Sequence, residues 1–384
     1  MRRELAIGIG VLLTIGAFVA PIGTDASERN RVIVVLRTDR AHDRVRQLSS
    51  VSSSVTLVGD LPATDSVVVE VDPGVIQTLE QNPDVLRIEP DAVVSIQKRA
   101  PAPQITPWGI DRIAAPASQS VSTGSSVKVA VIDTGIDLAH PDLLPNLRPG
   151  INIVRSTRTP DDDNGHGTHV AGIIGAANNT IGVVGVAPAV ELYPVKVLNS
   201  RGVGYLSDII AGIDWAIANR MDIINLSLGT SDDIQSMHDA VRRADAAGIT
   251  VVAASGNSGG AVMYPAAYDE VIAVGMTDDS NAVSRYSSRG PQLDLVAPGD
   301  DILSTYKGQR YREMTGTSMA SPHVVGVAAL LEAVPSRCDR NGDSHCNHSE
   351  LQARLQATAT DIGAAGYDTT SGYGIVNALR AVSP

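Results

Sequence analysis

Three short polar segments of this chain carry the residue types that nucleophilic catalysis needs. VIDTGID contains Asp133, DDDNGHGTHVAGIIG contains His166, and GTSMASPHVVG contains Ser318. A serine hydroxyl is a poor nucleophile until a base removes its proton, and a histidine base needs a carboxylate to fix its tautomer and stabilise its charged form. Each residue alone has an ordinary explanation as a turn, loop or helix-cap residue. The presence of all three residues, each close to a glycine at the predicted end of a strand or helix, favours a serine-based catalytic site.

The elements predicted around these segments indicate an α/β fold. Apolar strands are predicted at residues 127–133, 192–198, 223–227, 250–254 and 271–275, and amphipathic helices at 169–177, 206–220, 233–247 and 318–331. This alternation predicts a mainly parallel sheet covered on both faces, which is a three-layer α/β/α architecture. The reactive crevice of such a sheet lies at the carboxyl ends of its strands. All three candidate residues fall near that edge.

Residues 1–26 are typical of a secretory signal peptide. A basic head is followed by a mostly apolar run, and Thr24 and Ala26 have the small-residue spacing of a cleavage site. An uncleaved N-terminal anchor is the alternative. We expect a secreted, extracellular protein with no stable membrane span once the signal is removed.

Residues 27–102 are predicted to form a small separate domain, and residues 103–384 the main one. Runs at 32–36, 41–50, 55–58, 67–71, 74–82 and 85–88 follow the order β-α-β-β-α-β, the split βαβ motif of a small α+β ferredoxin-like domain. Three prolines between residues 98 and 107 predict an extended, exposed linker that a protease can cut. A permanent N-terminal domain is the alternative.

Composition excludes several classes of protein. The 42 acidic residues exceed the 30 basic ones, giving a net charge of −12, so no nucleic-acid partner is expected. The single long apolar run lies at the N-terminus, which excludes a multi-span membrane protein. The 2 cysteines are too few for a disulfide scaffold, although in an oxidising compartment a bond between Cys338 and Cys346 is favoured over two free thiols.

The three polar segments resemble those of the subtilisin-like serine peptidases, the subtilases, and they follow that family's chain order of Asp, His and Ser. The resemblance extends from Gln104 to the C-terminus. It implies that Asp133 orients the base, that His166 acts as general base and then general acid, and that Ser318 attacks the scissile carbonyl. It also implies that Asn257, in VVAASGNSG, donates to the oxyanion together with the backbone N–H of Ser318.

The resemblance also suggests how a peptide substrate is held. Two edge segments are expected to pair with its backbone. One contains Gly202, Val203 and Gly204, and the other contains Ser227, Leu228 and Gly229. Gly256, beside the oxyanion residue, is expected to contact the substrate as well. Such pairing predicts broad specificity. Met263 falls near the position of a pocket-floor glycine in subtilisin, so a preference for Ala or Leu over Phe before the cleaved bond is expected.

Calcium is the implied structural ion. The segment AANNTIGVVG matches a family loop, and the implied ligands are Gln104, Asp142, Ala177, Asn179, Ile181 and Val183. A calcium-free loop is the alternative. A second calcium site would use Asp339, Asn341, Asp343, Asn347 and Glu350, which have EF-hand spacing, although Ser344 replaces the expected glycine. Zinc at His166 and His169 is rejected because it would occupy the base.

Together these features predict a secreted serine endopeptidase that acts on proteins or peptides as a monomer. By the resemblance, residues 27–102 are a propeptide that assists folding and inhibits the cleft until it is cut away. An inactive subtilase-like binding protein is one alternative. A serine esterase is the other, but it requires G-x-S-x-G and the order Ser, Asp, His, whereas this chain has GTSMA with Ser318 last.

Overall fold

The computed structural model describes residues 29–37, 54–93 and 103–384. The chain divides into two compact units, Met1–Arg99 and Ala100–Pro384. The predicted signal peptide, the predicted helix at 41–50 and the first part of the predicted linker lie outside the described residues. None of the helices within the described ranges is both long and apolar enough to cross a membrane.

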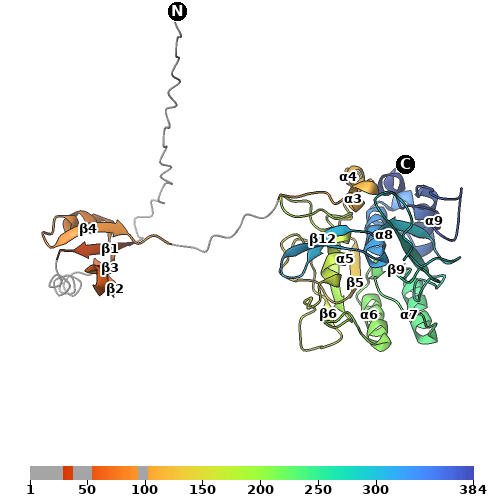
Figure 1. The fold of residues 1–384 in the computed structure, drawn as a ribbon, viewed down its shortest axis with the longest axis horizontal. Helices are drawn as coiled ribbons and strands as arrows, with labels where there is room; N and C mark the ends of the chain where they lie inside the picture. The colour runs from red at the N-terminus through yellow and green to blue at the C-terminus, as the bar shows by residue number, and fades with distance from the viewer. Residues whose placement is uncertain (1–28, 38–53, 94–102) are drawn as a thin grey trace, which may run out of the picture. The chain divides into compact units, whose positions relative to one another are not determined.

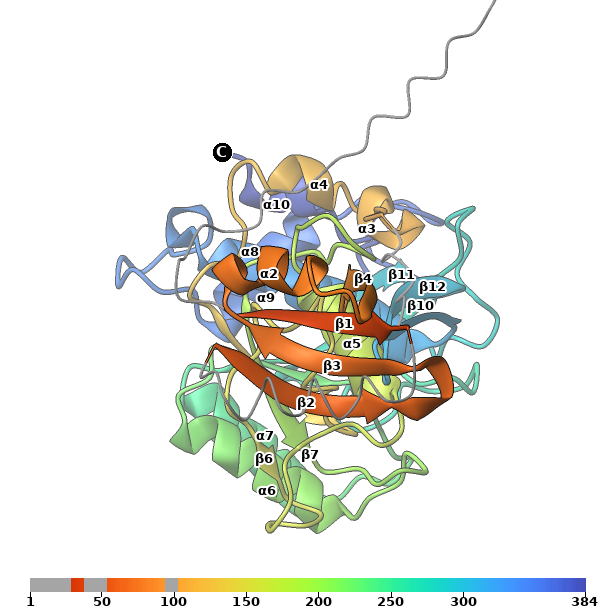
Figure 2. The ribbon, with the colours of Figure 1, turned by 90° about the vertical axis from the view of Figure 1, so that its left-hand side faces the viewer.

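The first unit contains a four-stranded antiparallel sheet in the order β2-β3-β1-β4 (Figure 2). Its elements are β1 (Asn30–Leu36), β2 (Val55–Leu61), the short helices η1 (Pro62–Thr64) and η2 (Pro73–Val75), β3 (Ser66–Val71), α2 (Ile76–Glu80) and β4 (Val85–Pro90). Valines of β1 and β3, with Leu79 of α2, form its small core. The four predicted strands and the second predicted helix are therefore present.

The second unit is built on a seven-stranded sheet in the order β11-β10-β9-β8-β5-β7-β6, in which every neighbouring pair is parallel. The strands are β5 (Lys128–Asp133), β6 (Ile151–Asn152), β7 (Glu191–Lys196), β8 (Ile223–Leu226), β9 (Thr250–Ala254), β10 (Val271–Thr277) and β11 (Leu295–Pro298). All residues of β9 and β10 are buried, as expected when helices cover both faces of a parallel sheet.

Helices complete the three-layer α/β/α architecture (Figure 1). One pair of packed helices is α5 (His166–Gly175) and α8 (Thr317–Glu332), and a second pair is α6 (Leu206–Ala218) and α7 (Gln235–Ala246). The remaining elements are α3 (Trp108–Arg112), α4 (Ala115–Ser118), the hairpin β12 (Ile302–Tyr306) with β13 (Arg310–Met314), η3 (Pro335–Arg337), α9 (His348–Thr358) and α10 (Ala378–Val382). The predicted fold class is confirmed.

The end of the predicted linker is not free. Gln104 N donates to Thr180 O at 3.1 Å, and Ile105 N donates to Gly182 O at 2.8 Å. The bridges Pro103 to Ile181 and Ile105 to Val183 extend this pairing. Pro103, Ile105 and Thr106 are exposed, as expected for the linker, but the backbone of residues 103–105 pairs with the 180–183 loop, so this part of the linker is attached.

Candidate active site

Asp133 and His166 meet at the carboxyl edge of the sheet. Asp133 is the last residue of β5 and is fully buried, and His166 is the first residue of α5. His166 Nδ1 lies 2.8 Å from Asp133 Oδ1 and 2.9 Å from Oδ2. A Cβ on Gly167 would lie 2.2 Å from Gly135 O, so only glycine lets the two segments approach this closely.

The surroundings of His166 favour its charged form. Burial lowers the pKa of the imidazole, but the charge of Asp133 and its hydrogen bond, with a further contribution from Asp162, outweigh burial and raise the pKa above its usual value. Because Nδ1–H donates to Asp133, Nε2 is the nitrogen left to accept a proton. The imidazole can therefore act as a base that becomes charged during a reaction.

Ser318 reaches the same edge from α8. It is the second residue of that helix, where backbone N–H groups have no partner within the helix. Ser318 Oγ donates to Ser227 O at 3.1 Å, just beyond the end of β8. Ser227 and His166 line the same cavity, which has a volume of about 570 Å³. The structure thus brings Asp133 and His166 into direct contact and connects Ser318, through Ser227, to the cavity that His166 lines.

Asn257 lies on the loop after β9, beside the start of α8. Its Oδ1 accepts from Thr317 N at 2.8 Å and from Thr317 Oγ1 at 3.0 Å. These two donors fix the orientation of the amide and leave Nδ2 as the group able to donate to another molecule. Asn257 and Ser318 line a second cavity of about 350 Å³.

All eight predicted substrate-binding residues line one of these two cavities. Gly202, Val203, Gly204 and Ser227 line the larger cavity, Gly256 and Met263 line the smaller one, and Leu228 and Gly229 line both. A Cβ on Gly256 would lie 2.6 Å from Met263 Sδ, so the thioether packs directly against the backbone there. Met263 and Ser318 line the same smaller cavity.

Sequence reasoning missed several residues that line the larger cavity. Leu206 and Ile209 on α6, Met237 on α7, and Tyr264 are among them. The apolar period of α6 assigns its residues only to the buried face, and that pattern does not separate a cavity wall from the core. Asn164, two residues before His166, also lines this cavity, and its place in the NGHG run was the available signal.

The first predicted calcium ligands lie close together. Gln104 Nε2 is 2.9 Å from Ala177 O, 3.3 Å from Val183 O and 3.5 Å from Asn179 Oδ1. Asp142 accepts from Asn179 Nδ2 and from Val183 N, each at 2.9 Å. The sixth predicted ligand, Ile181, donates its N–H to Asn179 Oδ1 at 2.7 Å. All six residues are thus linked by hydrogen bonds of 2.7 to 3.5 Å.

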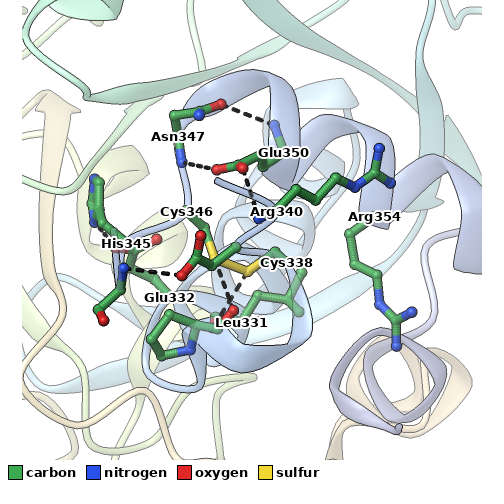
Figure 3. Close-up of a disulfide and its surroundings, with 12 residues drawn as sticks. Leu331, Glu332, Cys338, Arg340, His345, Cys346, Asn347, Glu350 and Arg354 are labelled. Atoms are coloured by element: carbon green, nitrogen blue, oxygen red, sulfur yellow. Dashed lines mark hydrogen bonds and ion pairs between the residues drawn. A yellow bond between two sulfur atoms is a disulfide. The ribbon is translucent and has the colours of Figure 1, made fainter. Parts of the chain in front are cut away.

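The second predicted calcium loop has another organisation. Glu350 and Asn347 form the capping box of α9, and Glu350 Oε1 also accepts from Arg340 N at 2.8 Å (Figure 3). Asp339 accepts from Gly342 N and Ser344 N, and Asp343 accepts from Asn341 Nδ2 and His345 N. The described part of the chain contains no group of three or more His, Cys, Asp or Glu that could hold a metal ion. Asp339, Asp343 and Glu350 therefore do not converge as the carboxylates of an EF-hand must.

A disulfide closes this loop. Cys338 and Cys346 are bonded, with their Cα atoms 5.7 Å apart, as favoured from the sequence. Beside the disulfide, His345 Nδ1 contacts Glu332 Oε1 at the end of α8 (Figure 3). Burial raises the pKa of Glu332, although the charge of His345 opposes that shift. The disulfide thus closes the loop on itself, and the contact between His345 and Glu332 joins the loop to the far end of the helix that carries Ser318.

His169 has a structural position that differs from that of His166. Its Nε2 lies 2.9 Å from both Ile302 O and Arg312 O, which belong to the β12–β13 hairpin. Burial lowers its pKa to about 4, so the ring is neutral near pH 7. His169 therefore connects α5 to the hairpin and does not join His166 in a metal site.

Comparison with known proteins agrees with this geometry. Residues 124–374 match the model of the subtilase family. An alkaline protease of Shouchella clausii is 42% identical over 358 residues, covering 92% of this chain and 89% of that protein. Subtilisin Savinase of Lederbergia lenta is 47% identical over 280 residues, which cover 72% of this chain and 99% of that protein. Alkaline elastase YaB of a Bacillus species is 46% identical over 315 residues, which cover 82% of this chain and 78% of that protein. The chain belongs to the subtilase family and is a serine endopeptidase of the subtilisin type.

Proposed function

We propose that the chain is made as a secreted proenzyme, removes its own N-terminal part, and then hydrolyses peptide bonds through an acyl-enzyme. The observation that carries the catalytic part is the contact of His166 Nδ1 with both carboxylate oxygens of Asp133, at 2.8 and 2.9 Å. This contact fixes one tautomer of the imidazole and stabilises its positive charge.

The proposed reaction begins when His166 Nε2 takes the proton of Ser318 Oγ as that oxygen attacks the scissile carbonyl. The carbonyl oxygen becomes an oxyanion, which accepts from Asn257 Nδ2 and from the backbone N–H of Ser318. His166 then gives its proton to the leaving amine, and an acyl-enzyme on Ser318 remains. Water, deprotonated by His166, releases the acid product and restores the serine.

Peptide backbone is proposed to bind between the segments Gly202–Gly204 and Ser227–Gly229, which line one cavity. The residue before the cleaved bond enters the smaller cavity, where Met263 packs against Gly256. Because a thioether fills part of that volume, small and medium apolar side chains such as Ala or Leu fit better than Phe.

The first predicted calcium site fits a bound Ca²⁺. The Gln104 amide nitrogen has two hydrogens, yet three oxygens lie within 3.5 Å of it. Carbonyl, amide and carboxylate oxygens are the ligands that Ca²⁺ prefers. The residues proposed to hold it are Gln104, Asp142, Ala177, Asn179, Ile181 and Val183. The ion would supply structural stability by joining the start of the second unit to the 177–183 loop.

Residues 27–102 are proposed to be the propeptide, after a signal peptide of 26 residues. The separation of the chain into two compact units at Arg99 supports this. The backbone pairing of residues 103–105 with the 180–183 loop supports it further, because a cut before Pro103 leaves that pairing intact.

The test compares wild-type chain with Ser318→Ala, both expressed for secretion. Intact mass and N-terminal sequencing of the secreted wild type should show a start near Gln104, whereas the variant should retain its N-terminal unit. The processed wild type should hydrolyse casein and react with a serine-directed fluorophosphonate. Equal processing of both chains would contradict self-cleavage. Hydrolysis of short-chain esters without casein cleavage would favour the esterase, and no labelling at all would favour the inactive binding protein.

A further inference from the structure

Asp162 lies four positions before His166 and is 5% exposed. Its carboxylate accepts five hydrogen bonds. Oδ1 accepts from Thr134 Oγ1 at 2.9 Å, Asn164 N at 2.9 Å and Gly165 N at 2.8 Å, and Oδ2 accepts from Thr168 N at 3.0 Å and Thr168 Oγ1 at 2.6 Å. One buried carboxylate thus binds the backbone on both sides of His166.

The pattern of donors requires the ionised carboxylate. Thr134 Oγ1 accepts from Gly167 N, and Thr168 Oγ1 accepts from Asp137 N, so each hydroxyl proton is free to point at Asp162. A protonated carboxyl would have to donate where five donors already converge. No Lys or Arg forms an ion pair with Asp162 among the described residues. The negative charge is therefore stabilised by neutral donors and by the N-terminus of α5.

Thr134 connects this carboxylate to Asp133. Thr134 N donates to Asp133 Oδ1 at 2.7 Å, and its hydroxyl bridges Asp162 and Gly167 N. The strand end that carries Asp133 and the helix start that carries His166 are thus joined through one hydroxyl group and one carboxylate.

We propose that Asp162 is a positioning residue for peptide hydrolysis, which holds the His166 turn against the Asp133 strand end and adds negative charge beside the imidazole. This inference rests on the proposed roles of Asp133 and His166. An amide at position 162 would have one acceptor oxygen, and its NH₂ would face at least two donors.

The groups around His166 come from several elements. Asp133 lies on β5, Asp162 on the preceding loop and His169 on α5, while Tyr306 of β12 donates to Asn164 O at 3.1 Å. Both carboxylates raise the pKa of His166, and His169 is neutral near pH 7 because burial lowers its pKa to about 4. Loss of the Asp162 charge should therefore lower the pKa of His166 and move the acid limb of the pH profile to lower pH.

The experiment measures kcat, KM and the pH dependence of fluorophosphonate inactivation in processed enzyme, counted by active-site titration. Asp162→Asn should lower kcat roughly ten- to a hundred-fold, since small displacements of reacting groups have effects of that size. KM should change less than about twofold, because substrate contacts remain. The acid limb of the inactivation profile should move to lower pH.

Two further variants separate charge from geometry. Thr134→Val removes the bridging hydroxyl but keeps the Asp162 charge, so kcat should fall while the acid limb keeps its position. Thr134→Ser keeps the hydroxyl and should retain wild-type kcat. The matched control is Asp279→Asn. Asp279 is exposed and lies away from this network, so its variant loses one negative charge and should match wild type in every measurement.

The outcomes distinguish this inference from the proposed function. If His166→Ala keeps wild-type activity, the proposed catalytic roles fail. If His166→Ala is inactive but Asp162→Asn and Thr134→Val both stay within twofold of wild-type kcat, the positioning role fails. If Asp162→Asn does not mature, the pair Thr134→Val and Thr134→Ser decides, and equal kcat in that pair would overturn the inference.

Discussion

The hydroxyl group of Ser227 donates to Ser318 O at 2.9 Å, while Ser318 Oγ donates to Ser227 O at 3.1 Å. Ser227 Oγ also accepts from Asn225 Nδ2 at 3.0 Å, and Asn225 is fully buried. Ser318 is therefore held to the end of β8 by a reciprocal pair of hydrogen bonds that continues into the core.

Replacing Ser227 by Ala should destabilise the enzyme by about 1–3 kcal/mol, because the buried Asn225 amide loses its acceptor. Denaturant unfolding of fluorophosphonate-inactivated mature enzyme measures this. The control is Ser231→Ala, which removes an exposed hydroxyl bonded only weakly to Asp232 at 3.4 Å. A Ser227→Ala variant as stable as the control would show that the pair adds nothing to stability.

Replacing Asn257 by Ala should lower kcat with little change in KM, because we propose that its amide donates to the oxyanion and not to the substrate ground state. The loss of the equivalent side chain in subtilisin is about a hundred- to a thousand-fold, and we take that size from subtilisin. Asn219→Ala, at the exposed C-cap of α6, is the control. The prediction fails if kcat of Asn257→Ala stays within threefold of wild type in steady-state assays.

Replacing Met263 by Ala should shift specificity toward larger residues before the cleaved bond. The substitution opens space against Gly256, so the ratio of kcat/KM for Phe over Ala substrates should rise by about tenfold or more. A peptide panel differing only at that residue gives the ratio for wild type and variant. Met314→Ala is the control, because Met314 lies on β13 and lines neither cavity. A wild type that already prefers Phe or Tyr strongly would refute the proposed pocket.

Calcium should stabilise the mature enzyme through the Gln104 and Asn179 site. At a calcium concentration about a hundred times its Kd, the gain is roughly 2.7 kcal/mol, so a chelator should lower Tm by about 5–10 °C. Asn179→Ala should reduce that chelator effect, whereas Asn341→Ala in the disulfide loop should keep it. Equal chelator effects in all three proteins would place the ion elsewhere.

The pH dependence of stability should reveal Asp294. Burial raises the pKa of its carboxyl from 3.8 to about 6, although hydrogen bonds from Ala273 N, Gln352 and Gln356 oppose the shift. The folded chain then holds a proton that the unfolded chain has already released. Stability from this group is present below about pH 4 and is lost as pH rises toward 6.

Asp294→Asn should remove this loss. The stability of the variant relative to wild type should therefore rise between pH 4 and 6 and stay constant above it, as measured by denaturant unfolding of inactivated enzyme. Asp279→Asn, at an exposed position, should show no such trend. A constant difference between Asp294→Asn and wild type from pH 4 to 7 would contradict the raised pKa.

Five of the seven strands of the central sheet, β5, β7, β8, β9 and β10, were predicted because burial on both faces leaves a continuous apolar run. The short strands β6 and β11 were missed because two and four residues are too few to show such a run. The prediction for β9 matches at both ends. The start of α5 was predicted three residues late, since glycines beside His166 weaken the helical pattern while tertiary contacts with Asp162 hold that turn. The β12–β13 hairpin was missed because β13 is largely exposed and its sequence RYREM lacks apolar alternation.

The residues of the candidate site could be predicted where they lie in long sequence motifs. They could not be predicted where neighbouring residues of the same type differ only in their surroundings in the fold. Asp161, Asp162 and Asp163 are consecutive, yet Asp162 is buried with five donors and Asp163 is mostly exposed. Residue type alone cannot separate them, because the difference comes from which side chain the turn directs at the start of α5. The EF-hand-like spacing of residues 339–350 did not identify the role of Asn347 and Glu350 as a helix cap. The reason is related, since helix caps and metal sites both use Asp, Asn and Glu.

The bond between Cys338 and Cys346 has a consequence for an enzyme that hydrolyses peptide bonds. Residues Arg340 to Ser344 are exposed between the two bonded cysteines, so a cut in this stretch would fall inside the closed loop. A molecule nicked there keeps both fragments attached and gains only the mass of one water. Such a cut would not be detected on a non-reducing gel, because the two fragments would migrate together. Only a reductant would separate them.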